Sequence, residues 1–359
     1  MTSPALRIEA VSVADSARLA PAWRNLAGRA EPNVFAEPAY LLPALTRLVR
    51  PGVRLVFVWK GAALIAVAAL EPPRFPLGLA RVWQSEQAAL PAVLVDANEA
   101  AAALDALRAW VRDAFPWAAG LIVPSVERGS RLAGAAPGVA VADFARAALR
   151  LGAGAAADAE SAKRRKEARR LERRLAERGP VELRCGADDD AIEGFLRLEA
   201  QGWKGARGTA LASRTERVAF ARAMLAAFAA EGRMKIFALF VADSPVAAGV
   251  LLRSGRRGFF WKTAYDERFA DFSPGAALTR ALGRRLTTDA HLDTVDSCAA
   301  PNHPMIDRLW ADRLSFADLA LDLGSPARFR TALAIERVLR RARASLKRLV
   351  LPFLGGKRW

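Results

Sequence analysis

The 359-residue sequence predicts an α/β fold in which mixed, mostly antiparallel sheets are flanked by helices. Three observations predict this class: successive segments alternate in polarity as strands do, short turns separate them, and a capped amphipathic helix follows. In the second half of the chain we expect strands at 234–241, 246–253 and 256–264. The helix then runs from Ser273 to about Thr288, and a strand, a helix and a last strand follow at 292–297, 304–311 and 315–323.

The start of that helix, Ser-Pro-Gly at 273–275, is suited to binding an anion. Serine is a preferred N-cap, proline fits the first helical position, and glycine lets a ligand approach the backbone. The amides of Gly275, Ala276 and Ala277, at the positive end of the helix dipole, are predicted to bind a phosphate or pyrophosphate. Arg280 follows on the same helix and adds positive charge. The alternative is an ordinary capped helix.

This order of elements resembles the acyl-CoA-dependent GNAT acyltransferases. Three motifs are similar to the branch named for the cellulose-biosynthesis protein CelD, which is itself related to the FemABX peptidyltransferases: Trp203-Lys204 after an acidic helix, the run from Trp261-Lys262 to Glu267, and Ser273-Pro-Gly275. The resemblance covers about residues 161–322. It implies acetyl-CoA or another acyl-CoA as the donor, bound by Ser273, Gly275, Ala276, Ala277 and Arg280.

One position departs from the family pattern. GNAT proteins usually carry Arg or Gln three residues before the first small residue of the pyrophosphate loop, and this chain has Phe272 there. We therefore expect donor binding to depend on backbone amides and neighbouring arginines.

The resemblance also locates the chemistry, because the acyl thioester of a GNAT protein lies where the fourth and fifth strands separate. Tyr265 ends the fourth strand and is expected to protonate the departing thiolate, with Asp266 as a candidate base. Asp296 and His303 follow the fifth strand and are further candidates for accepting a proton. His303 or Asn302 can instead cap the next helix.

Other side chains are candidates for weaker reasons. Cys298 can complete a nucleophilic Asp–Cys–His site or be a buried thiol. We expect the acceptor to contact Trp203, Lys204, Trp261 and Lys262, although core packing is the alternative for each tryptophan. No metal site is expected, because the two histidines and two cysteines have no ligand spacing.

The first half of the chain is interpreted as a second copy of the same unit. Its hairpin at 55–70 resembles the hairpin at 238–252 in pattern and residue type, although two Ala/Val-rich hairpins can look alike by chance. A strand at 6–11 and helices at 16–27 and 38–49 precede it; a helix at 99–115 and a strand at 118–123 follow. We expect a tandem GNAT-like fold: an N-terminal domain at 1–150 without cofactor, an acyltransferase domain at 151–325 and a basic helix at 326–359.

The formal net charge of +17 comes mainly from two segments. Residues 163–178 carry net +6 and residues 328–359 net +9, so nucleic-acid binding over the whole fold is not expected. The first segment is a solvated helix or a cationic rim beside the site. The second is amphipathic, with an apolar stripe that either lies on an anionic membrane surface or packs against the body. That stripe consists of Ile335, Leu339, Ala342, Leu346 and Leu349.

The sequence points to a cytoplasmic enzyme, peripheral at the inner membrane if the basic helix binds lipid. It has no apolar run long enough to span a bilayer, no evident signal peptide and only two cysteines. The predicted activity is acyl transfer to an amine or hydroxyl of a sugar, polysaccharide or envelope precursor. The alternatives are FemABX-like aminoacyl transfer, with charged tRNA on the basic helices, and a catalytically silent scaffold of a membrane polysaccharide machine.

Overall fold

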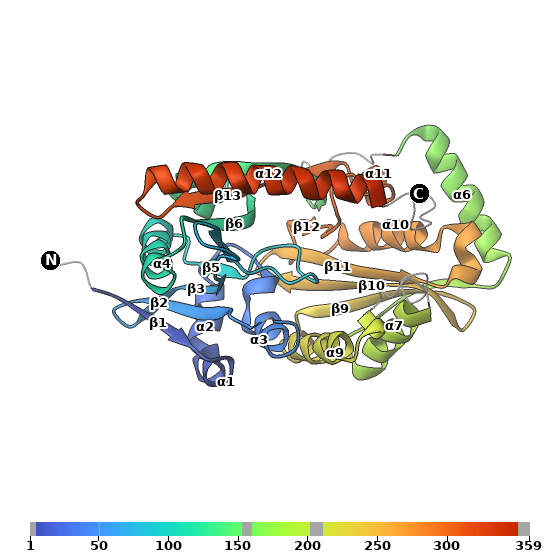
Figure 1. Ribbon diagram of the computed structural model, residues 1–359. Helices are drawn as coiled ribbons and strands as arrows, with labels where there is room; N and C mark the ends of the chain where they lie inside the picture. Colours follow the sequence, from blue (N-terminus) through green and yellow to red (C-terminus); the bar gives the residue numbers. More distant parts are fainter. Residues whose placement is uncertain (1–4, 50, 153–159, 202–210, 351–359) are drawn as a thin grey trace. The chain divides into compact units, whose positions relative to one another are not determined.

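The structure is a computed structural model that describes residues 5–49, 51–152, 160–201 and 211–350. The chain forms two compact units, each built from more than one segment (Figure 1). Unit 1 comprises Met1–Glu31, Arg50–Phe144 and Ser315–Trp359, and unit 2 comprises Pro32–Val49 and Ala145–Leu314.

The sheet of unit 1 has the strand order β1-β2-β3-β4-β6-β13, with β5 beside β3. Neighbouring strands are antiparallel except β4 and β6, which are parallel. The strands are β1 (Leu6–Val11), β2 (Arg54–Lys60), β3 (Ala63–Glu71), β4 (Leu79–Val82), β5 (Val93–Val95), β6 (Gly120–Glu127) and β13 (Asp312–Asp322).

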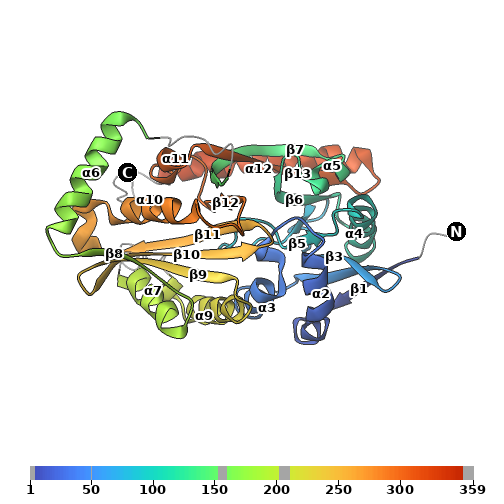
Figure 2. The ribbon, with the colours of Figure 1, turned by 180° about the vertical axis from the view of Figure 1, so that it is seen from behind.

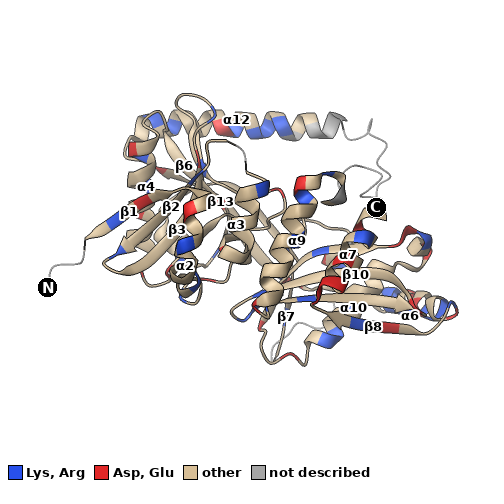
Figure 3. Cartoon of the chain, turned by 90° about the horizontal axis from the view of Figure 1, so that it is seen from below, with Lys and Arg blue, Asp and Glu red and all other residues tan. Residues whose placement is uncertain are grey.

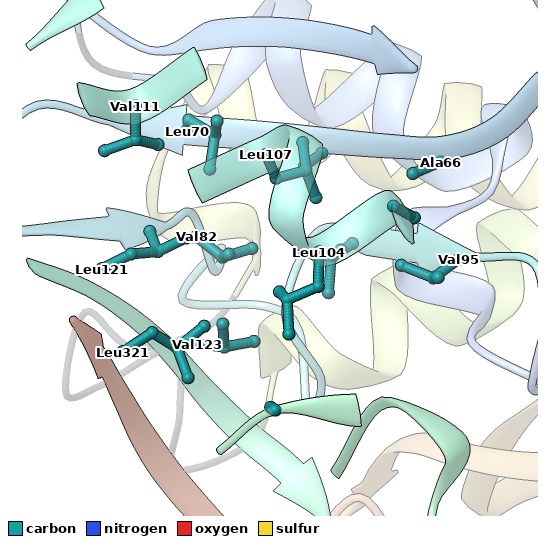
Figure 4. Close-up of a cluster of buried hydrophobic side chains, with 14 of the residues drawn as sticks. Ala66, Leu70, Val82, Val95, Leu104, Leu107, Val111, Leu121, Val123 and Leu321 are labelled. Carbon is teal, nitrogen blue, oxygen red and sulfur yellow. The ribbon is translucent and has the colours of Figure 1, made fainter. Parts of the chain in front are cut away.

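The core of unit 1 lies where helix α4 packs on this sheet. Leu104, Leu107 and Val111, spaced by three and four residues, form the buried face of α4 and are clustered with apolar side chains of six strands, some of which Figure 4 shows. The helices of unit 1 are α1 (Val13–Ser16), α2 (Ala20–Ala27), α4 (Ala100–Ala114), α5 (Arg131–Ala135) and α12 (Pro326–Val350), with a 3₁₀ turn η1 (Ala17–Leu19).

The sheet of unit 2 has the order β7-β12-β11-β10-β9-β8, antiparallel except for the parallel pair β11 and β12. Strand β7 (Val139–Arg150) belongs to this unit from Ala145 onward. The other strands are β8 (Val181–Gly186), β9 (Met234–Val241), β10 (Ser244–Ser254), β11 (Arg257–Tyr265) and β12 (Thr294–Asp296).

Helices cover both faces of the unit 2 sheet: α10 lies on one face, and α7 and α9 on the other (Figures 1 and 2). Leu278, Leu282 and Leu286 recur every four residues along α10 and are buried in one cluster with the strands. The helices are α3 (Pro38–Arg47), α6 (Ala162–Ala176), α7 (Asp189–Gln201), α9 (Thr215–Ala230), α10 (Pro274–Leu286) and α11 (Ile306–Leu309), with 3₁₀ turns η2 (Val34–Ala36), η3 (Leu211–Ser213) and η4 (Glu267–Phe272).

The two units share one topology, which confirms the predicted tandem arrangement. Each has four antiparallel strands (β1 to β4, and β8 to β11), then a helix (α4 or α10), a parallel strand (β6 or β12) and a final antiparallel neighbour (β13 or β7). The hairpins whose sequences resemble each other, β2–β3 and β9–β10, occupy equivalent places.

The two units differ from the predicted division in two segments. Residues 32–49 join unit 2, because Phe35 packs edge-on against Phe259 and Tyr40 against Phe220, with ring centroids 5.7 and 5.2 Å apart. Residues 315–359 join unit 1, because β13 pairs with β6. Residues 153–159, which follow the expected boundary at residue 150, lie outside the described residues.

No helix within the described ranges has both the length and the apolar composition needed to cross a bilayer.

Candidate active site

The loop between β11 and α10 differs from the simple N-cap that the sequence predicts. Ser273 has left-handed backbone angles (φ 50°, ψ 55°), and its side chain makes no capping hydrogen bond. Its carbonyl oxygen accepts the N–H groups of Ala276 at 3.0 Å and Ala277 at 3.1 Å. These two amides are therefore engaged within the turn, so among the three amides predicted to bind an anion Gly275 is the one whose N–H the Ser273 carbonyl does not use. The first turn contains no carboxylate.

Tyr265 lies beside this loop. A Cβ added to Gly275 would stand 3.8 Å from Cδ1 of Tyr265 and 3.7 Å from Sδ of Met305, so these three residues meet at the start of α10. Burial, followed by the nearby Glu267 carboxylate, raises the pKa of Tyr265 above its ordinary value. The phenol therefore stays protonated at neutral pH, as a proton donor must.

A β-bulge interrupts β11 close to this point. Val250 of β10 stands opposite Lys262, and Leu251 stands opposite Phe260, so one extra residue, Trp261, is inserted in β11. Bulges are frequent beside active sites because they redirect the backbone and side chains. Nothing in the local sequence pattern indicates this bulge.

Asp266, the first candidate base, is held by an arginine. Its carboxylate accepts the Arg268 backbone N–H at 2.9 Å and the Arg268 Nη2 at 2.6 Å. The side-chain hydrogen bond from Arg268 lowers the pKa of Asp266 below its ordinary value. Asp266 is therefore ionised at neutral pH, but it is a weak proton acceptor.

Phe272, which replaces the Arg or Gln of the family pattern, has two arginines over its ring. The guanidinium carbon of Arg174, on α6, lies 5.4 Å from the ring centroid, and that of Arg178 lies 5.7 Å from it. Both arginines are exposed, and Phe272 directly precedes the anion loop. The arrangement supports the cationic rim that was one of the two interpretations of the basic segment.

Arg280, which the sequence predicts as an acyl-CoA ligand, forms ion pairs with two carboxylates. Its Nε lies 3.0 Å from Glu172 of α6, and its Nη1 lies 3.4 Å from the buried Glu160. The side chain is only 13% exposed. These contacts fit a role in holding α6 against α10 better than a role in phosphate binding.

Asp296, the second candidate base, forms a buried ion pair. Its two carboxylate oxygens accept Nε and Nη2 of Arg146 at 2.7 and 2.6 Å, and Oδ1 also accepts the Cys298 N–H at 2.9 Å. The two side chains are 0% and 3% exposed. Because both oxygens are engaged by a buried cation, this geometry fits a structural role better than proton transfer.

The contacts of His303 favour a helix cap over a catalytic base, and the surroundings of Cys298 favour a buried thiol over a nucleophile. Nδ1 of His303 accepts the N–H groups of Met305 at 3.3 Å and Ile306 at 3.4 Å, as a cap before α11 does. Burial, followed by the Asp296 carboxylate, raises the pKa of the Cys298 thiol well above its ordinary value. A thiol in this state is a poor nucleophile.

We expect His303→Ala to lower the free energy of unfolding by about 1 kcal/mol, because two backbone N–H groups lose their acceptor. The acyl-transfer rate should stay at the wild-type value. Denaturant unfolding and a turnover assay on the same preparation check both parts. A large loss of rate at unchanged stability would instead make His303 catalytic.

The structure describes two of the four residues that we expect to contact the acceptor substrate. Trp261 is 6% exposed and meets the ring of Phe220, with centroids 6.3 Å apart, which fits the core alternative. Lys262 places Nζ 5.5 Å from the Trp261 ring centroid. Trp203 and Lys204 lie outside the described residues.

One carboxylate was missed at the sequence level. Glu199 of α7 is 1% exposed; its Oε2 accepts the Leu211 N–H at 2.8 Å, and its Oε1 has no hydrogen-bond partner among the described residues. Its spacing from Ile192, Phe195 and Leu196 places it on the buried face of α7, and this pattern could have revealed it. A buried acid with an unmet hydrogen bond is a candidate functional group.

Within the described residues, no three or more His, Cys, Asp or Glu side chains are grouped as a metal site. Residues 162–303 match the family model described as an acetyltransferase (GNAT) domain. No curated protein matches the chain.

Solved structures show the same fold at low identity. The C-terminal domain of a protein assigned as a lysylphosphatidylglycerol synthetase from Agrobacterium fabrum has a TM-score of 0.56 and 11% identity, covering 91% of this chain and 96% of that chain. FemX has a TM-score of 0.52 and 10% identity, covering 87% and 96%. A conserved protein of unknown function from Bacteroides thetaiotaomicron has a TM-score of 0.52 and 12% identity, covering 89% and 100%. The fold is the GNAT fold.

Proposed function

We propose that unit 2 transfers an acyl group from acyl-CoA to an amine or hydroxyl of a sugar, polysaccharide or envelope precursor. The observation that carries this proposal is the meeting of Tyr265, Gly275 and Met305 at the start of α10, beside the bulged strand β11. Acetyl-CoA is the simplest donor. Within the GNAT fold we propose the CelD-like branch, on the Trp-Lys, Trp261–Glu267 and Ser-Pro-Gly motifs.

The proposed acyl-CoA site combines the N-terminus of α10 with two arginines. The Gly275 amide and the dipole of α10 suit the pyrophosphate, and no acidic residue opposes it in the first turn. We assign Arg174 and Arg178 as the source of the positive charge that Phe272 does not supply, because both guanidinium groups lie over its ring. Unit 1 carries no Ser-Pro-Gly loop, and we propose that it binds no donor.

The chemistry requires one proton acceptor and one proton donor. The amine or hydroxyl of the acceptor substrate attacks the thioester carbonyl carbon of acyl-CoA and gives its proton to a general base. The C–S bond breaks, and the CoA thiolate gains a proton from a general acid. Tyr265 suits the role of the general acid, because its raised pKa keeps the phenol protonated. We assign the base to Glu199, because arginines hold both Asp266 and Asp296.

Donor binding can be tested at Gly275. At 100 times its dissociation constant, acyl-CoA should stabilise the wild-type protein by about 2.7 kcal/mol, measured as a rise in melting temperature over a panel of acyl chains. Gly275→Asp should weaken binding about 10- to 100-fold more than Gly275→Asn, which has the same size without the charge. Calorimetric titration measures both variants.

Gly275→Ala is the control for bulk, because its Cβ would make only ordinary contacts at 3.7 and 3.8 Å. Equal affinity in the Asp and Asn variants, both folded, would remove the anion site from the loop. Absence of stabilisation by every acyl-CoA would favour FemABX-like aminoacyl transfer if charged tRNA binds. It would favour a catalytically silent scaffold if charged tRNA does not bind.

A further inference from the structure

Helix α12 has two separate faces, and only one of them packs on unit 1. Phe329, Ala332 and Leu333 are buried in a cluster with Leu79 of β4 and residues of β6 and β13. Farther along the same face, Glu336 is 6% exposed. The positions 329, 333 and 336 recur every three or four residues, so they define one inner face of the helix.

A buried polar cluster fixes the rotation of α12. Oε1 of Glu336 lies 2.6 Å from Nη2 of Arg81 on β4 and 2.7 Å from Nε of Arg340. Arg340 also donates from Nη1 to Asp318 of β13 at 2.7 Å. Burial raises the pKa of Glu336, but the guanidinium groups of Arg81 and Arg340 together hold this pKa below its ordinary value. These bonds hold Glu336 and Arg340 inward, and therefore determine which side chains point outward.

The outward strip is apolar and exposed, and it includes three residues of the predicted stripe; Leu339 of that stripe is half-buried, and the side chain of Leu349 lies outside the described residues. Ile335 is 37% exposed, Val338 62% and Leu346 61%, and Ala342 is also exposed. At about 100° per residue, these positions fall within about a quarter of a turn of one another and do not overlap the inner face. Exposed apolar residues in a contiguous strip indicate an interaction surface.

Positive charge flanks this strip on both sides. Arg341 flanks one edge and Arg343 the other, and both are exposed. Basic residues recur along α12 (Figure 3). Residues 328–359 contain ten basic residues and one acidic residue, Glu336, and that residue is turned inward. This face of α12 therefore presents apolar side chains between cations, and no carboxylate of the described part of the helix points outward.

We propose that the outer face of α12 binds an anionic lipid surface, with Ile335, Val338, Ala342 and Leu346 among the acyl chains and Arg341 and Arg343 on the headgroup phosphates. A helix in the plane of a membrane has this arrangement, because its apolar strip enters the headgroup boundary while arginines reach anionic headgroups on both sides. The charge complementarity favours lipid over a protein partner. This inference is independent of the proposed acyl transfer, since it concerns unit 1 alone.

Co-sedimentation of the full chain with vesicles tests the proposal. The protein should bind phosphatidylcholine vesicles that contain phosphatidylglycerol, bind pure phosphatidylcholine much more weakly, and dissociate at high salt. Arg341→Gln and Arg343→Gln should each weaken binding about fivefold, and the double change Val338→Ser with Leu346→Ser at least as much. All four positions are exposed, so the melting temperature should not change.

Arg112→Gln is the matched control, because it removes the same charge from an exposed site on α4. It should bind like the wild-type protein. The proposal is overturned if the wild-type chain does not bind anionic vesicles at low salt, if it binds neutral vesicles equally well, or if Arg112→Gln weakens binding as much as Arg341→Gln does.

Discussion

Asp296→Asn is expected to lower the free energy of unfolding by about 3–5 kcal/mol, because it leaves the Arg146 guanidinium buried without its carboxylate. The pair is bidentate, and its side chains are 0% and 3% exposed. It also joins two neighbouring strands, since Asp296 of β12 stands opposite Ala148 of β7. Denaturant unfolding followed by tryptophan fluorescence measures the loss.

Two further variants separate this effect from others. Asp293→Asn breaks a similar bidentate pair with Arg256 only three residues away, but that pair is exposed and its loss should have little effect. The double variant Arg146→Met with Asp296→Leu should recover most of the stability, because apolar residues of similar volume can replace a buried pair. Unchanged stability of Asp296→Asn, with turnover lost, would return Asp296 to the role of base.

The elements that position the site could be predicted because their signals are local. Strand β9 begins and ends at the predicted residues, β10 and β11 begin and end within two residues of theirs, and α10 begins directly after Ser273. Alternating polarity and the Ser-Pro-Gly start are contained in a few consecutive residues. The three strands and the helix that surround the candidate site can therefore be predicted from the sequence.

The partners of the charged residues could not be predicted in the same way. The sequence predicts Asp296 as a candidate base because it follows a strand, yet its partner Arg146 lies 150 residues earlier. The sequence predicts Arg280 as a ligand of the donor, yet its partners Glu160 and Glu172 precede it by 120 and 108 residues. Spacing along the chain indicates a charged side chain but not the opposite charge that the fold places beside it.

The neighbours of two strands could not be predicted for a related reason. Strand β13 was predicted as a strand at 315–323, but its pairing with β6 depends on residues 120–127. Strand β7 was not predicted at all, although its final residues complete the sheet of unit 2 beside β12. A period-2 pattern specifies which face of a strand is buried but not the neighbour with which it pairs. The duplicated hairpin could be predicted because both of its strands are contiguous in sequence.

Glu199→Gln is expected to lower kcat about 100- to 10,000-fold if Glu199 is the base, because glutamine cannot accept the proton of the incoming nucleophile. Stability should change little, because the glutamine oxygen can still accept the Leu211 N–H, which now lies 2.8 Å from Oε2. Glu193→Gln on the same helix is the control: its carboxylate is exposed and pairs with Arg222, so that variant should keep full turnover. A turnover assay on acyl-CoA and an amine acceptor, with melting curves on the same samples, decides the matter. Full turnover in Glu199→Gln would assign the buried carboxylate to fixing the Leu211 backbone and leave Asp266 as the base.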